Sequence, residues 1–160
     1  MKNIRNLTQK IILQLTKEKQ TITFAESCTG GRVATEFTAV SGASNVLNGS
    51  VVTYSNAIKH QWLGVSLHTL KAQGAVSHAC VEEMLEGVQK LANSDYAIAI
   101  SGIAGPTGGT PDKPVGTVYI GIQTPFQKEI FHCCFNGNRE EVQEQSLIFS
   151  IEKLAKMMNL

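Results

Sequence analysis

The chain has 160 residues, of which 42% are hydrophobic and 17% are charged. This balance is typical of a globular protein and excludes an intrinsically disordered chain. The formal net charge of +1 and the lack of a Lys/Arg stripe argue against a nucleic-acid partner. No apolar run approaches the ~20 residues of a membrane-spanning helix, and the N-terminus carries no apolar signal core. We therefore expect a cytoplasmic protein that does not enter a membrane, with a single domain over residues 1–160.

The first third of the chain alternates between helical and strand-like patterns. Apolar residues at helical spacing predict a helix over residues 3–19. A short strand over 21–26 runs into a turn and a second helix over 32–40. A β-rich segment then predicts a strand over 47–54, and Ser55 is placed to cap the helix that follows it.

Two further helices and a buried strand are expected in the middle of the chain. Ser66 and Ser77 each lie between two apolar residues at the spacing of a hydrophobic staple, which predicts a helix start at both positions. The second of these helices continues to Leu91. The segment 96–100 is apolar on both faces, as expected of a central strand.

The last third predicts a hairpin and a final helix. Strands over 115–123 and 129–135 are separated by a short connection, which favours an antiparallel pair. Asn138 and Glu141 have the spacing of a capping box at the start of the last helix. The predicted fold is α/β, a single domain whose mixed β-sheet is covered by helices on both faces.

The four cysteines do not indicate a metal site. They form no CxxC pair, and the adjacent Cys133 and Cys134 would point to opposite faces of a strand. No two histidines show HxxxH spacing with a partner acid. We expect reduced, packed thiols, no metal and no cofactor.

The first candidate site is the turn that follows the first strand, with the sequence ESCTGGR. Ser27 lies where N–H groups at a helix start are free, which suits a nucleophile whose attack creates an oxyanion. Gly30 and Gly31 leave room for a ligand beside the backbone. Two alternatives stay open: Ser27 or Thr29 is only the helix N-cap, or Cys28, expected to point inward, is the nucleophile.

The second candidate pairs Tyr54, at a strand end, with Lys59, near the start of the next helix. A lysine can remove a proton from serine when burial lowers its pKa, and Ser-Lys arrangements are a known variant of the catalytic triad. Tyr54 could relay or orient that proton. The alternative is a lysine that reaches into solvent and a tyrosine that only packs.

The third and fourth candidates are a glycine-rich loop and an arginine. The loop runs from Ser101 to Gly116, and its consecutive N–H groups can bind a phosphate or a carboxylate, although a flexible turn is the alternative. Arg139 lies near a helix N-terminus, where a cation is disfavoured, which suggests an anionic ligand. The alternative is an ion pair of Arg139 with Glu140 or Glu141.

Six segments in one order resemble the CinA C-terminal domain family: AESCTGG, VVTYSNAIK, GAVS, SGIAGPTGG, KPVGTV and FNGNR. The resemblance implies hydrolysis of the carboxamide of nicotinamide mononucleotide to nicotinic acid mononucleotide and ammonia, in bacterial pyridine-nucleotide salvage. It further implies a cytoplasmic, usually homo-oligomeric protein that needs no metal for this step. Longer relatives carry an additional N-terminal pyrophosphatase domain, which we do not expect in a chain of this length.

The resemblance implies that Ser27 is the nucleophile and that Lys59, with Tyr54, moves its proton. The N–H groups of Cys28, Thr29 and Gly30 are then expected to hold the oxyanion. The residues expected to bind the small-molecule nucleotide are Gly31, Ser101, Gly105, Thr107, Gly108, Gly109 and Arg139.

Two positions depart from the family pattern. Asn138 stands where an aspartate is frequent, and Gln143 where a second arginine is common. Two other functions stay open, namely a non-catalytic nucleotide-binding or partner-binding module of the same fold and an amidase for another nucleotide-like amide. The intact Ser27, Tyr54 and Lys59 argue against a module that has lost catalysis.

Overall fold

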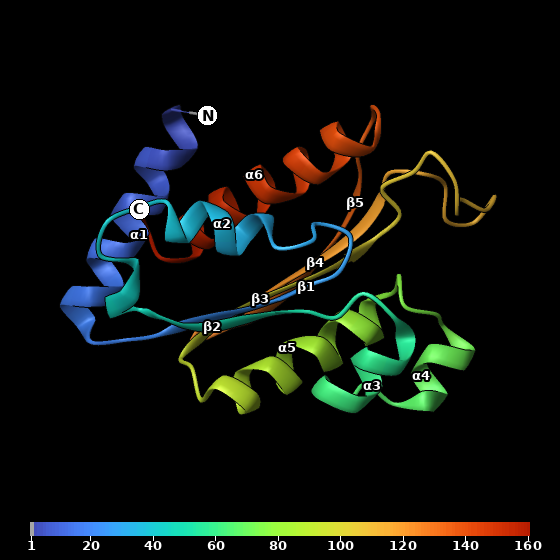
Figure 1. The fold of residues 1–160 in the computed structure, drawn as a ribbon, viewed down its shortest axis with the longest axis horizontal. Coiled ribbons are helices and arrows are strands. Elements are labelled where there is room, and N and C mark those ends of the chain that lie inside the picture. The colour runs from blue at the N-terminus through green and yellow to red at the C-terminus, as the bar shows by residue number, and fades with distance from the viewer. Residues whose placement is uncertain (1) are drawn as a thin grey trace.

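A mixed five-stranded sheet lies between two layers of helices in residues 2–160, the part of the chain that the computed structural model describes (Figure 1). The strands are β1 (Ile22–Glu26), β2 (Leu47–Val52), β3 (Tyr96–Gly102), β4 (Thr117–Gln123) and β5 (Lys128–Cys134), in the spatial order β2-β1-β3-β4-β5. β1 pairs in parallel with β2 and β3, whereas β4 runs antiparallel to β3 and β5. The predicted mixed sheet is confirmed.

Helices cover both faces of this sheet, as the sequence predicts. One layer consists of α1 (Lys2–Glu18), α2 (Arg32–Thr38) and α6 (Arg139–Met157), and a short 3-10 helix, η1 (Ala43–Asn45), follows α2. The other layer consists of α3 (Asn56–Leu63), α4 (Leu67–Ala72) and α5 (His78–Ala92). Figure 1 shows the two layers on opposite sides of the strands.

The central strand β3 explains how both layers pack. Ile98 and Ile100 join the core on the side of α1 and α6, while Ala97 and Ala99 join the core on the side of α5. Alternation along a strand sends these pairs to opposite faces. All four are fully buried, and each isoleucine contributes roughly 1.5–3 kcal/mol by its burial.

The helix starts are where the sequence places them. The hydroxyls of Ser55, Ser66 and Ser77 each accept a hydrogen bond from the backbone N–H three residues on, at the starts of α3, α4 and α5. Asn138 and Glu141 form the predicted capping box at the start of α6. These caps supply acceptors for N–H groups that have no partner inside the helix.

Strand ends near the glycine-rich loop differ from the prediction. β4 begins at Thr117 rather than at residue 115, because the Gly116 N–H turns back to donate to the Ile103 carbonyl at 2.8 Å. Gly116 has a φ of +95°, a conformation that favours glycine. β3 in turn extends to Gly102, two residues further than predicted.

The topology brings four chain segments to one edge of the sheet. β1, β2 and β3 are parallel, and β5 runs in their direction because two antiparallel steps separate it from β3. The carboxyl ends of these four strands therefore lie at the same edge. This is where open α/β sheets bind ligands, and it is where the segments after β1, β2, β3 and β5 carry all four candidate sites.

Candidate active site

Ser27 and Lys59 are in direct contact at this edge. Ser27 follows β1 and is buried, with 7% of its surface exposed, and its Oγ lies 2.9 Å from Lys59 Nζ. The Ser27 N–H donates to the Ile100 carbonyl of β3 at 3.0 Å, which fixes the residue against the sheet. The alternative that Ser27 or Thr29 caps α2 is wrong, because Gly31 occupies the N-cap position and makes no side-chain cap.

Lys59 lies in the first turn of α3 and is 1% exposed. Its Nζ also lies within hydrogen-bond distance of the Thr53 carbonyl, at 2.8 Å, and of the Tyr54 carbonyl, at 3.4 Å. Burial lowers the pKa of this amine. A neutral amine has two N–H donors and one lone pair, so it can donate to both carbonyls and accept the Ser27 hydroxyl proton. The alternative of a solvent-reaching lysine is therefore wrong.

Glu26, which was not predicted as a site residue, holds the turn together through hydrogen bonds to its carboxylate. Its fully buried carboxylate accepts hydrogen bonds from Thr29 Oγ1 at 2.6 Å and Gly31 N–H at 3.1 Å, and from two N–H groups in the first turn of α2. An acidic side chain at the positive end of a helix is favourable. The signal for this role was an acid at the end of the predicted strand over 21–26, ahead of the turn that leads into the predicted helix over 32–40.

The N–H groups of the turn are not equally available for an oxyanion. Gly30 donates to the Ser27 carbonyl at 3.0 Å, and Gly31 donates to Glu26. The prediction that Gly30 donates to the oxyanion is therefore wrong, because its N–H already closes the turn by bonding the Ser27 carbonyl. The N–H groups of Cys28 and Thr29 bond to no acceptor within residues 2–160.

Cys28 points into the core, as predicted. It is buried and packs with the apolar residues between the sheet and α1, α2 and α6. Burial raises the pKa of its thiol to about 12. Because the thiolate is the nucleophilic form of cysteine, Cys28 is a poor alternative to Ser27 at neutral pH. Cys133 and Cys134 also lie as expected, one buried and one exposed.

A cavity of about 250 Å³ opens over Ser27. The predicted residues that line it are Ser27, Cys28, Tyr54, Lys59, Ser101, Gly105, Thr107, Gly108 and Arg139. The sequence analysis missed Asn56, Ala75 and Val76, which also line it; the latter two belong to the GAVS segment. Three other predicted residues, Thr29, Gly30 and Gly31, instead line a separate pocket beside Arg32, and Gly109 is not part of this wall.

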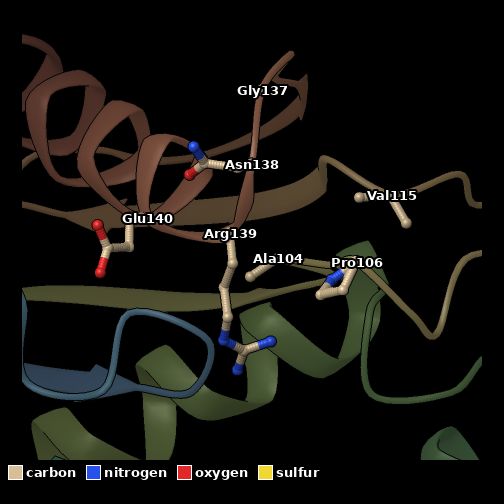
Figure 2. Close-up of a pocket in the computed structure, with 7 residues that line it drawn as sticks. All are labelled: Ala104, Pro106, Val115, Gly137, Asn138, Arg139 and Glu140. Atoms are coloured by element: carbon tan, nitrogen blue, oxygen red, sulfur yellow. The ribbon is translucent and has the colours of Figure 1, made fainter.

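Arg139 lines this cavity and joins two of its other lining residues. Its Nη1 donates to the Gly105 carbonyl and its Nη2 to the Tyr54 hydroxyl, both at 2.7 Å. The alternative of an ion pair with an adjacent glutamate is wrong: Glu141 accepts from the Asn138 N–H, and Figure 2 shows Arg139 extending away from Glu140. A second cavity, of about 570 Å³, lies against Arg139 and Pro106 (Figure 2).

Tyr54 contacts the candidate catalytic pair only through its backbone. Its carbonyl faces Lys59, whereas its hydroxyl accepts the hydrogen bond from Arg139. The side chain is exposed, at 61%. This geometry corrects the prediction that Tyr54 passes the Ser27 proton, because its hydroxyl hydrogen-bonds neither Ser27 nor Lys59.

The glycine-rich loop is hydrogen-bonded at its base and between Thr110 and Lys113, and its free N–H groups lie along its first half. Ile103 N–H donates to the Thr117 carbonyl at 2.8 Å, and Lys113 Nζ donates to the Gln73 carbonyl at 2.6 Å. Within residues 2–160, the N–H groups of Ala104, Gly105 and the segment 107–109 bond to no acceptor. Such a run of free N–H groups suits an anion.

Two kinds of feature are absent from residues 2–160. In that range no three His, Cys, Asp or Glu side chains come together in a way that could hold a metal ion. None of the helices described combines the length and the apolar composition needed to cross a membrane.

Comparison with known proteins extends over nearly the whole chain. The CinA C-terminal domain model matches residues 4–158. A CinA-like protein of Thermotoga maritima is 46% identical over 153 residues, covering 94% of this chain and 37% of its own length. The chain thus spans little more than a third of the curated relatives it matches.

Solved structures show the same fold. The competence damage-inducible protein A (ComA) from Klebsiella pneumoniae superposes with a TM-score of 0.93 at 36% identity, covering 98% of this chain and 97% of that one. The competence/damage inducible protein CihA from Agrobacterium tumefaciens gives a TM-score of 0.93 at 33% identity, covering 96% and 94%.

Proposed function

The chain belongs to the CinA C-terminal domain family, and from this premise we propose that it is a serine amidase. Its substrate in this proposal is nicotinamide mononucleotide, and its products are nicotinic acid mononucleotide and ammonia. The observation that carries the proposal is the 2.9 Å contact between Ser27 Oγ and Lys59 Nζ. A buried lysine with a lowered pKa, facing a serine at the carboxyl edge of the sheet, is suited to be a general base.

The reaction divides into two acyl-transfer steps. Ser27 Oγ attacks the carboxamide carbon and gives its proton to Lys59 Nζ. The carbonyl oxygen gains the negative charge and accepts hydrogen bonds from the N–H groups of Cys28 and Thr29, a contribution of roughly 3–4 kcal/mol per donor in the transition state. The Lys59 ammonium then protonates the leaving nitrogen, and ammonia departs to leave an ester on Ser27. Water, deprotonated by Lys59, hydrolyses that ester.

The remaining walls suit the rest of a nucleotide. In the proposal, the 5′-phosphate binds to Arg139 and to the free N–H groups of Thr107 and Gly108, which line the cavity. Arg139 uses two of its five N–H donors on Gly105 and Tyr54, so the others remain for phosphate oxygens. Ser101, at the end of β3, lies in the same cavity and supplies a hydroxyl for the ribose or the carboxamide.

The test is an ammonia-release assay with the purified chain on a panel of nicotinamide compounds. We expect release from nicotinamide mononucleotide, with nicotinic acid mononucleotide formed in equal amount and no loss of rate in EDTA. Ammonia from another nucleotide-like amide alone would move the proposal to that substrate. Binding of nucleotide without ammonia would identify a non-catalytic module.

The family also motivates two proposals about the protein's state. We propose that the chain forms a homo-oligomer and works in the cytoplasm, where its thiols stay reduced. Light scattering coupled to size-exclusion chromatography measures the first, and a mass of 17.3 kDa in solution would contradict it.

A further inference from the structure

Gln143 joins the second turn of α6 to the turn that carries Ser27. Its Nε2 donates to the Cys28 carbonyl at 2.8 Å, and its Oε1 accepts from Arg32 Nη2 at 2.8 Å. A carbonyl can only accept and a guanidinium can only donate, so these partners fix which end of the amide is nitrogen. Arg32 thereby orients the amide that holds Cys28.

The carbonyl that Gln143 holds belongs to the central peptide of a β-turn. The Gly30 N–H donates to the Ser27 carbonyl at 3.0 Å, so the Cys28–Thr29 peptide lies at the centre of the turn. In a planar trans peptide the C=O and N–H groups point in opposite directions. Holding the Cys28 carbonyl toward α6 therefore sets the direction of the Thr29 N–H, which is one of the free donors beside Ser27.

Thr29 itself excludes the largest alternative orientation. Turning this peptide over would convert the turn to type II, which needs a positive φ at Thr29. Thr29 has no such φ in the structure, and a β-branched residue strongly resists one. What Thr29 leaves free is the smaller tilt of the peptide, and the hydrogen bond from Gln143 restrains that tilt.

We propose that Gln143 is a positioning residue for the reaction: oriented by Arg32, it keeps the Cys28–Thr29 peptide turned so that the Thr29 N–H faces the oxyanion. This rests on the proposed serine amidase function. A purely structural role, in which Gln143 only ties α2 to α6 through Arg32, makes a different prediction for one substitution.

That substitution is Gln143→Glu. The carboxylate keeps an acceptor for Arg32, now as an ion pair, but it has no N–H to donate to the Cys28 carbonyl. We expect kcat for nicotinamide mononucleotide to fall about tenfold, as loss of one oriented hydrogen bond implies, with KM within about twofold and an undiminished melting temperature. A wild-type kcat in this variant would overturn the proposal and leave only the structural tie.

Gln145→Glu is the matched control. Gln145 lies on the same helix, and its Nε2 donates to the carbonyls of Asn136 and Glu141 rather than to the Ser27 turn. The variant makes the same charge change two residues away. We expect an unchanged kcat, and a tenfold loss here as well would overturn the assignment to Gln143, since charge alone would explain both.

A second readout does not depend on the substrate. A fluorophosphonate forms a bond from Ser27 Oγ to phosphorus as fluoride leaves, the serine proton passes to Lys59, and negative charge develops on the phosphoryl oxygen. Mass spectrometry should show labelling of Ser27 about tenfold slower in Gln143→Glu than in the wild type. Equal rates would overturn the proposal. Slower labelling of the variant in a protein that releases no ammonia would support it while overturning the proposed substrate.

Discussion

The two walls of the candidate site are built in opposite ways. In the turn of residues 26–31, Glu26 accepts four hydrogen bonds, Gln143 holds the Cys28 carbonyl, and Lys59 contacts Ser27. In the loop of residues 103–116, hydrogen bonds hold the base and residues 110–113, while the N–H groups of Ala104, Gly105 and the segment 107–109 have no acceptor within residues 2–160. Side chains of the first wall are thus already hydrogen-bonded without a ligand, whereas the second wall has N–H groups that are free to bind one.

This difference separates two tasks that the proposed amidase must combine. Groups that act on the transition state have to be in place before the substrate arrives, because reorganising them during the reaction costs rate. Groups that bind a nucleotide's outer parts can complete their hydrogen bonds when the ligand arrives. Changes to the turn should therefore alter kcat or stability, and changes near the loop should alter substrate binding.

Removing the nucleophile should have the largest effect. Ser27→Ala is expected to lower kcat by at least about a thousandfold while the fold persists, because a nucleophile typically contributes several orders of magnitude. Ammonia release from nicotinamide mononucleotide and the melting temperature measure the two parts. Cys28→Ala is the control: a cavity in the core lowers its stability, but its kcat should stay near the wild-type value. A kcat loss confined to Cys28→Ala would make the thiol the nucleophile.

Removing the base comes next. Lys59→Met keeps most of the side-chain volume and should lower kcat by roughly a thousandfold, the middle of the range that a general base contributes. Only the neutral amine can take a proton, so wild-type kcat should rise with pH through the lowered pKa of Lys59 and fall on the acid side. A variant with normal turnover and the same pH profile would remove Lys59 from the mechanism.

The lowered pKa of Lys59 should also make the stability of the protein depend on pH. The unfolded chain holds the Lys59 proton up to its ordinary pKa of 10.5, whereas the folded chain releases it at lower pH. The unfolded state binds more protons in that window, so wild-type stability rises with pH there. Lys59→Met should lose this dependence and be more stable than the wild type at neutral pH. Urea unfolding at several pH values measures both.

Substituting Glu26 tests how much the hydrogen bonds of the turn contribute to the stability of the protein. Glu26→Gln replaces a carboxylate oxygen by an NH₂ group that cannot accept from the N–H donors it faces. We expect a loss of roughly 2–3 kcal/mol in the free energy of unfolding, because buried donors lose a charged acceptor. Asp112→Asn makes the same change in the exposed loop and should leave stability unchanged. Equal losses would contradict the contrast between the walls.

The sequence predicted the parts of this site that local chemistry determines. Ser27 and Lys59 were identified from a strand-to-helix turn and a capped helix, and both sit where parallel strands end. Their contact across 32 residues follows from β1 and β2 being neighbours. Motif spacing and hydrophobic periodicity located the two residues, but only the family resemblance favoured catalytic roles for them over a helix cap and a solvent-reaching lysine.

Contacts between distant segments could not be predicted in this way. Gln143 bonds a carbonyl 115 residues away, and Arg139 meets a tyrosine hydroxyl 85 residues away. The sequence offers many acceptors for each donor, and only the packing of α6 on the sheet selects one. The corrected role of Gly30 has another cause: its N–H closes the turn locally, and spacing did not separate a turn amide from a helix-start amide.

Arg139 contacts the loop of residues 103–116 at the Gly105 carbonyl, so its substitution tests whether this side of the site binds the phosphate. Arg139→Ala should lower kcat/KM for nicotinamide mononucleotide by about 10–100-fold, the loss expected for hydrogen bonds to a charged group. The phosphate-free riboside should lose much less. The two substrates are compared in both proteins, so any general damage to the site cancels. An equal proportional loss would mean that Arg139 does not bind the phosphate. Lys113, which lies on the glycine-rich loop, would then be the next residue to test.

The Tyr54 hydroxyl should have the smallest effect. It accepts from Arg139 Nη2 at 2.7 Å and makes no bond to the Ser27–Lys59 pair, so it restrains the arginine rather than moving the proton. Tyr54→Phe removes that acceptor and keeps the ring. One exposed hydrogen bond contributes roughly 0.5–1.5 kcal/mol, so KM for nicotinamide mononucleotide should rise up to about tenfold, with kcat nearly unchanged. In Arg139→Ala the same substitution should have no further effect, because its partner is gone. A large fall in kcat, present in both backgrounds, would instead return Tyr54 to the proton path.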